Sequence, residues 1–268
     1  MPGPLCVGFA SRISGLSDLL RYSLLSLVVF ITHFQEAITG FGCTVLALPF
    51  VIFLLGLDVA VKVLVIQAWI LTAYIVITAR ADIVWRQYGR IVLFAGLGLP
   101  VGIVLAGCLP ESALKCVLGV FMVEMAARGI VTQLCRHEHT RWSPTPLVNV
   151  LMNAVLFAGG IVHGAFGSGG PLVVICATRA LPNKTLFRVT LCMLWLTLNT
   201  TLVLTWAAAR ALTPEIWLYT AICTPFTVVG MVIGDRCHHR INEHAFRLMV
   251  FGVLLLSGAA VLYSAGRH

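Results

Sequence analysis

His163-Gly-Ala-Phe-Gly-Ser-Gly-Gly-Pro171 lies late in an apolar stretch, 146–178, that is longer than one simple transmembrane span. A helix that crosses the hydrocarbon core needs roughly 20 residues at ~1.5 Å each. Glycine costs about 1 kcal/mol in a helix interior and proline about 3 kcal/mol. Five such residues between Gly164 and Pro171 therefore predict a broken helix or a re-entrant hairpin at this place.

The first half of the chain contains a stretch of the same kind. Thr39-Gly-Phe-Gly-Cys-Thr44, followed by Pro49, interrupts the apolar stretch 22–56. A second break or hairpin is predicted here for the same reason.

The composition places both stretches in a lipid bilayer. Hydrophobic residues make up 59% of the 268 residues and charged residues only 10%, whereas soluble proteins carry about 25% charged residues. Further apolar runs are each long enough for a span: 63–79, 91–109, 117–134, 189–209, 216–234 and 248–266. We therefore expect an all-α integral membrane protein with about eight transmembrane segments, six to ten being compatible with the sequence.

The charge and the cysteines exclude other classes. The net charge of +8 comes from basic residues in short loops between the apolar runs, as the positive-inside rule predicts, so nucleic acid is not an expected partner. The nine cysteines are odd in number, lack a CxxC pair and lie mostly in apolar runs, where they are expected to be buried and neither disulfide-bonded nor metal-bound. The first 20 residues lack the pattern of a cleaved signal peptide.

Short similarities recur in the same order in both halves. The pairs are Phe41-Gly42-Cys43 with Phe166-Gly167-Ser168, Lys62 with Arg188, Trp69 with Trp195, Arg80 with Arg210, Gly98 with Gly230 and Lys115 with Arg247. They predict one transmembrane domain, 1–268, built of an internal repeat at about 20–134 and 145–266, joined by the polar segment 135–144. Chance similarity among apolar helices is the alternative.

The basic residues also bear on topology. If both overlong stretches are re-entrant or cross twice, eleven basic residues lie on one side of the membrane and six on the other, with Arg128 inside a span. A single crossing by each stretch makes the two sides nearly equal. The bias therefore favours an odd number of crossings per half, which means inverted repeats with both termini outside.

Paired glycine-interrupted segments at equivalent places in two repeats indicate the binding site of a secondary transporter. The helix after each break would present free N–H groups and the positive end of its dipole, which suit an anion. Close helix packing through small residues is the alternative explanation of the glycines.

Both segments resemble the signatures of the TauE/SafE family of sulfite exporters. Thr39 to Pro49 is similar to the first signature and Gly164 to Val174 to the second, and Phe187, Arg188 and Asn199 also fit. The resemblance covers nearly the whole chain and implies transport of small anions such as sulfite and organosulfonates, without a cofactor. Cys43 and Thr44 depart from the small residues common in the first signature, so the two half-sites need not be equally engaged.

The candidate substrate-binding residues follow from the breaks and from this resemblance. They are Thr39, Gly40, Phe41, Gly42, Cys43, Thr44, Phe166, Gly167, Ser168, Gly169, Gly170, Arg188 and Asn199. Arg188 suits an oxyanion because a guanidinium forms paired hydrogen bonds, and snorkelling to lipid headgroups is its alternative role.

Three ionisable residues near the breaks are candidates for proton coupling: Glu36, His33 and His163. A structural, hydrogen-bonded role is the alternative for each of them. Glu124 and Arg128, four residues apart, are expected to neutralise each other.

An enzymatic function is not expected. Ser168 lacks the glycine two residues before it that serine hydrolases carry, and the clusters at His137 to His139 and Cys237 to His239 lack HExxH spacing. We expect a multi-pass protein of the cell inner membrane that transports a small inorganic or organic anion by alternating access, has membrane lipid as its surroundings and is compatible with a homodimer. An anion channel and a non-transporting structural membrane protein are the alternatives.

Overall fold

A computed structural model describes residues 4–134, 146–181, 183–238 and seven positions between 251 and 263, with side chains described from Asp18 onward. The described residues are helical apart from short connections, and no strand occurs among them. The helices are α1 (Pro4–Thr39), α2 (Cys43–Leu55), α3 (Leu57–Ala79), the short 3-10 helix η1 (Arg80–Asp82), α4 (Trp85–Cys108), α5 (Glu111–Leu134), α6 (Pro146–Phe166), α7 (Gly170–Ala180), α8 (Lys184–Ala208) and α9 (Pro214–Cys237).

Six of these helices are long and apolar enough to cross a membrane. Their spanning parts are 18–39, 57–82, 85–108, 147–166, 184–208 and 214–237. The predicted all-α membrane class is thereby confirmed, whereas the predicted count of about eight spans is not. Helix α5, 24 residues long, is not among these six, and most of the predicted span 248–266 lies outside the described residues.

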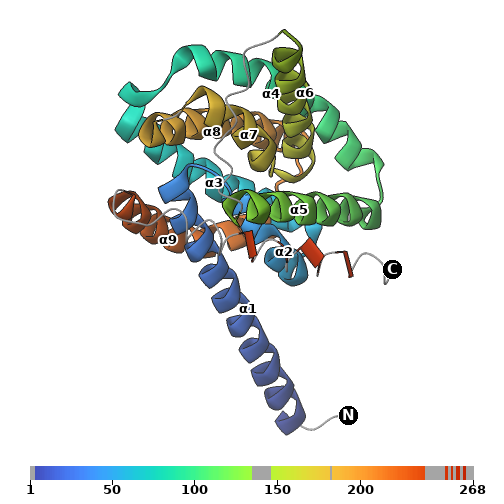
Figure 1. Ribbon diagram of the computed structural model, residues 1–268. Helices are drawn as coiled ribbons and strands as arrows, with labels where there is room; N and C mark the ends of the chain where they lie inside the picture. Colours follow the sequence, from blue (N-terminus) through green and yellow to red (C-terminus); the bar gives the residue numbers. More distant parts are fainter. Residues whose placement is uncertain are drawn as a thin grey trace.

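Helix α1 is longer than the membrane requires. Its 36 residues correspond to about 54 Å, against the ~30 Å of a hydrocarbon core. Its N-terminal part projects beyond the other helices, while its C-terminal part lies among them (Figure 1).

Both glycine segments interrupt the helices as predicted. Helix α1 ends at Thr39 and α2 begins at Cys43, while α6 ends at Phe166 and α7 begins at Gly170. After the second break α7 runs back along α6, since a Cβ on Gly159 would contact Val173 and Cys176 Sγ donates to the Met152 carbonyl. Each break therefore turns the chain around inside the bundle and starts a short return helix, α2 of 13 residues and α7 of 11.

The two breaks also have matching positions in the helix order. The same number of residues separates three pairs of positions: Thr39 and Phe166, Cys43 and Gly170, and the first residues of α3 and α8. In this register Gly40 pairs with Gly167, because each has a positive φ and donates its N–H to the carbonyl four residues before it. The internal similarities in the sequence had instead paired Gly167 with Gly42, which lies two residues after Gly40. The internal repeat itself stays a prediction, and its matches at Lys115 with Arg247 lie partly outside the described residues.

Small residues bring α4 and α6 into close contact. The helices run parallel, and Gly98 and Gly102 of α4 face Gly160 and Gly164 of α6. A Cβ on Gly102 would collide with the backbone of α6 at Ile161 and Ala165. In a bilayer such close packing stabilises helix pairs because lipid removes the hydrophobic driving force between them.

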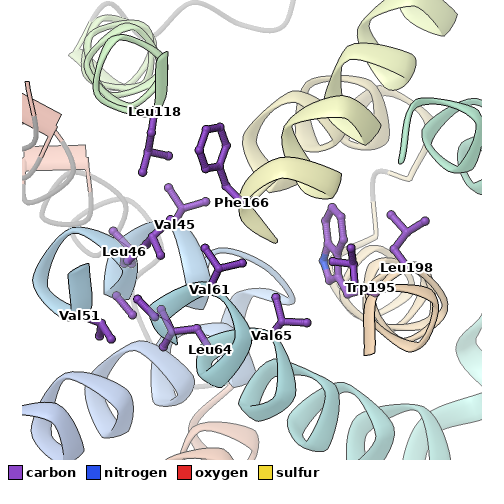
Figure 2. Close-up of a cluster of buried hydrophobic side chains, with 14 of the residues drawn as sticks. Val45, Leu46, Val51, Val61, Leu64, Val65, Leu118, Phe166, Trp195 and Leu198 are labelled. Carbon is purple, nitrogen blue, oxygen red and sulfur yellow. The ribbon is translucent and has the colours of Figure 1, made fainter. Parts of the chain in front are cut away.

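A shared apolar core holds the broken helices in place. Figure 2 shows part of it, with Val45 and Leu46 of α2 beside Val61 and Leu64 of α3, and with Leu198 beside Trp195 on α8. Polar links tie the same layer together. Gln67 of α3 donates to the Thr220 carbonyl of α9 at 2.8 Å and accepts from Thr227 at 2.7 Å. Gln67 therefore links α3 to α9.

On α5, Glu124 and Arg128 form the ion pair that their spacing predicted. The predicted connector, 135–144, lies outside the described residues, as do His239, Arg240 and Arg247.

We expect the α4–α6 contact to be sensitive to side-chain volume. Gly102→Val should lower the free energy of unfolding by about 1–3 kcal/mol, the usual cost of overpacking, because its side chain meets the α6 backbone. Gly96→Val on the same helix is the matched control, since a Cβ there meets nothing within 4 Å. Thermal unfolding in detergent measures both, and equal midpoints would contradict this account of the contact.

Candidate functional site

The two breaks meet at one internal pocket. Its cavity volume is about 20 Å³ in this conformation, room for a water molecule, and it receives residues from both halves of the chain. Its lining residues are Glu36, Gly42, Thr44, Val45, Ala68, His163, Gly167, Ser168, Gly170, Trp195 and Asn199. The pocket therefore lies between the ends of α1 and α6, the beginnings of α2 and α7, and the middle of α3 and α8.

The first break requires glycine. Gly40 and Gly42 have φ values of 84° and 104°, in the left-handed region that residues with a Cβ rarely adopt. A Cβ on Gly40 would also lie 2.7 Å from Arg188 Cα. Gly40 thus allows α8 to pack directly against the unwound main chain.

Side chains satisfy the carbonyl groups that the first break exposes. The Trp195 indole donates to the Gly40 carbonyl at 3.0 Å, and Gln35 Nε2 donates to the Phe41 carbonyl at 3.1 Å. Thr39 Oγ1 lies 3.0 Å from the same Phe41 carbonyl. This network is needed because an unsatisfied backbone group in hydrocarbon costs several kcal/mol.

Glu36 caps the return helix of the first break. Its Oε2 accepts a hydrogen bond from the Cys43 N–H at 2.8 Å, and its side chain is buried. A carboxylate at this place interacts favourably with the positive end of the α2 dipole. The N-terminus of α2 therefore already has a carboxyl group of the chain itself as its hydrogen-bond acceptor.

The corresponding position at the second break is His163. Its Nδ1 accepts from the Gly169 N–H at 3.4 Å, and its Nε2 lies 3.0 Å from Asn199 Oδ1. The ring stacks on Trp195 with a centroid distance of 5.3 Å and an interplanar angle of 23°. His163 is thereby held in one orientation by α7 and α8, and it leaves the α7 N-terminus without a carboxylate.

Ser168 differs from the other polar residues of the pocket. Its residue is 2% exposed, and its Oγ has no hydrogen-bond partner among the described residues. It lines the pocket two residues before α7 begins, where the first turn of a helix leaves N–H groups without intrahelical partners. Buried polar atoms are rarely left unpaired in this way unless a ligand, ion or water completes the site.

The sequence-derived candidates divide into two groups. Those that line the pocket are Glu36, Gly42, Thr44, His163, Gly167, Ser168, Gly170 and Asn199. Those that lie beside it and do not line it are His33, Thr39, Gly40, Phe41, Cys43, Phe166, Gly169 and Arg188.

Arg188 is paired with a carboxylate of α9, whereas the sequence suggested a substrate oxyanion as its partner. Its Nη2 donates to Asp235 Oδ1 of α9 at 2.5 Å, and its side chain is 6% exposed. The guanidinium is buried in this ion pair, so neither a substrate oxyanion nor a lipid headgroup is its partner in this conformation. Likewise His33 Nδ1 bonds the Val29 carbonyl of its own helix at 2.8 Å.

Three lining residues escaped the sequence analysis, namely Val45, Ala68 and Trp195. Val45 and Ala68 are ordinary apolar residues without any distinguishing pattern. Trp195 was noticed only as the repeat partner of Trp69, and nothing in the sequence indicates that its indole reaches the Gly40 carbonyl 155 positions away.

The helices that are long and apolar enough to span a membrane make this a multi-pass membrane protein. Two helix breaks that share one pocket fit a membrane transporter. A protein-family model described as "Sulfite exporter TauE/SafE" matches residues 25–261 of the chain. The chain therefore belongs to the TauE/SafE family, as the two glycine segments predicted. No curated protein and no solved structure matches it.

The Trp195 bond to the break can be tested against a second tryptophan. Trp195→Phe leaves the Gly40 carbonyl unpaired and should lower the free energy of unfolding by about 1–3 kcal/mol. Trp69→Phe is the control, because its partner Thr200 Oγ1 keeps a 2.6 Å bond to the Leu196 carbonyl. Thermal unfolding should show the larger loss for Trp195→Phe, and a larger loss for Trp69→Phe would overturn this role.

Proposed function

We propose that this protein is a secondary transporter that moves a small oxyanion across the cell inner membrane by alternating access. Sulfite or an organosulfonate is the preferred substrate class, since the family is described by sulfite export. The pocket between the two breaks is the substrate site.

The unpaired Ser168 hydroxyl at the start of α7 is the observation that carries this proposal. The donors at this place are the hydroxyl and the N–H groups of Gly170 and Leu172, because Pro171 has no N–H and the Gly169 N–H bonds His163. The dipole of α7 adds a positive potential there, which suits the several acceptor oxygens that sulfite and sulfonates carry on one sulfur.

The two breaks have different roles in this proposal. Glu36 already occupies the N-terminus of α2, so a substrate anion there would face a carboxylate unless a proton neutralises it. The anion therefore binds at α7, beside Ser168 and His163, and Glu36 carries the coupled proton. This difference agrees with the departure of Cys43 and Thr44 from the family's first signature.

We propose transport without chemical conversion. The two ring nitrogens of His163 are directed to Gly169 and Asn199, so the geometry does not place this histidine as a base for Ser168. Lipid is the proposed neighbour of the exposed apolar residues on α4, such as Leu93, Leu97 and Val104. A homodimer is compatible with this arrangement, and nucleic acid is not a proposed partner.

A hydroxyl deletion tests the substrate site. Ser168→Ala should weaken sulfite binding about tenfold or more, because a hydrogen bond to a charged group contributes about 1.5–3 kcal/mol. Ser23→Ala is the matched control, since Ser23 is exposed on α1 and donates to the Leu19 carbonyl of its own helix. Calorimetry on the purified protein measures both affinities. An unchanged affinity in a folded Ser168→Ala protein would remove Ser168 from the site.

A charge deletion tests proton coupling. Glu36→Gln keeps an oxygen that accepts from the Cys43 N–H but cannot take up and release a proton. In proteoliposomes a proton gradient should drive labelled sulfite uptake by the unmodified protein, while the variant should show exchange without a response to the gradient. A full response of Glu36→Gln to the gradient would exclude Glu36 as the proton carrier.

The same proteoliposomes separate a carrier from a channel. A carrier saturates with substrate and shows counterflow, so internal unlabelled sulfite should accelerate uptake of the label. Flux that rises linearly without counterflow would favour the anion channel, and no flux of any small oxyanion would favour a structural membrane protein.

A further inference from the structure

A second cavity lies next to the substrate pocket and shares none of its lining residues. Its cavity volume is about 240 Å³. It is lined by Leu57, Asp58, Val61, Lys62, Ile103, Ala106, Leu109, Leu114, Gly164, Ala165 and Trp206. Gly164 and Ala165 follow directly on His163 of the first pocket, so the last turn of α6 borders both cavities.

Lys62 is the basic residue of this cavity. The residue is only 8% exposed, and its Nζ donates to Asp58 Oδ2 at 2.7 Å. The Asp58 side chain is 76% exposed. The cation is thus inside the cavity, while its counter-ion lies at the rim in contact with solvent. Because Asp58 reaches the ammonium group from solvent, another anion can approach Lys62 by the same route.

Snorkelling does not account for this arrangement. A snorkelling lysine extends its amine past lipid-facing apolar surface into water, whereas Lys62 lines an internal cavity whose other walls are mostly apolar. Such low-dielectric walls focus the field of a single charge and raise the local concentration of counter-ions.

The charge distribution indicates which side of the membrane this cavity faces. At its end of the bundle α3 begins and α4 and α8 end, and the described basic residues there are Arg21, Lys62, Lys115 and Arg210. The opposite end carries more of them: Arg80, Arg86, Arg90, Lys184, Arg188 and Arg236. By the positive-inside rule the Lys62 cavity faces outward. The Arg188–Asp235 pair joins α8 to α9 toward the opposite end, where α8 packs on Gly40.

We propose that Lys62 and the cavity around it form an outer anion site, at which the substrate oxyanion replaces Asp58 before it reaches the inner pocket. This inference rests on the proposed transport function and adds a second site to it. The inner pocket binds through hydroxyl and N–H donors, whereas the outer site binds through one ammonium group.

Labelled sulfite uptake into proteoliposomes tests this site through the split between KM and kcat. Lys62→Gln should raise KM about tenfold, the lower range of electrostatic steering effects, while kcat changes little. Lys62→Arg should restore a KM near that of the unmodified protein. Asp58→Asn should lower KM, because it removes the competing carboxylate.

Arg210→Asn is the matched control for a general loss of positive charge. Arg210 is exposed at the same end of the bundle, and asparagine tolerates its φ of 54°. The proposal is overturned if Lys62→Gln leaves KM unchanged, or if Arg210→Asn raises KM as much. Should Lys62→Gln fail to fold, an unchanged or raised KM in Asp58→Asn overturns it instead.

The outcome for the unmodified protein separates this inference from the proposed function. Transport by the unmodified protein with no effect at Lys62 and Asp58 rejects the outer site alone. No transport by the unmodified protein rejects the proposed function and the outer site together.

Discussion

Unwound main chain inside an apolar bundle is the constraint on which the rest of this structure depends. At each break a few peptide groups lose their helical partners, and hydrocarbon offers them none. The protein supplies Trp195 and Gln35 for the carbonyls of the first break, and it supplies Glu36 and His163 for the N–H groups that begin α2 and α7. Glu36 and His163, which the sequence offered for proton coupling, are therefore hydrogen-bonded to the backbone first.

The two side chains that cap the breaks, Glu36 and His163, differ in their chemistry, and this difference makes the two sides of the pocket unequal. Glu36 places a carboxyl group at the start of α2. At the start of α7 the corresponding residue is His163, and the Ser168 hydroxyl beside it is unpaired among the described residues. In the proposed function the break at α7 therefore holds the anion and the break at α2 holds the proton. The close α4–α6 packing through glycines supports this arrangement, because it fixes α6 up to the residue where the second break begins.

The candidate site was only partly predictable, and the reasons are physical. Glycine and proline act on their own backbone, so the breaks at Gly40 and Gly167 were visible in the sequence. A charged side chain chooses its partner by proximity in space, so Arg188 looked like an anion ligand until α9 placed Asp235 beside it. The sequence likewise suggested that Lys62 and Arg188 are related, yet Lys62 lines a cavity and Arg188 is paired with Asp235 of α9.

The sequence by itself determined the membrane class, the positions of both breaks and the family, because each depends on composition or on local backbone preference. Tertiary structure alone decided that the breaks share one pocket, that Trp195 reaches Gly40 and that Lys62 faces a separate cavity. These features depend on how helices far apart in the chain pack together. Apolar helices in lipid carry little sequence information about that packing, since most of their faces are equally hydrophobic.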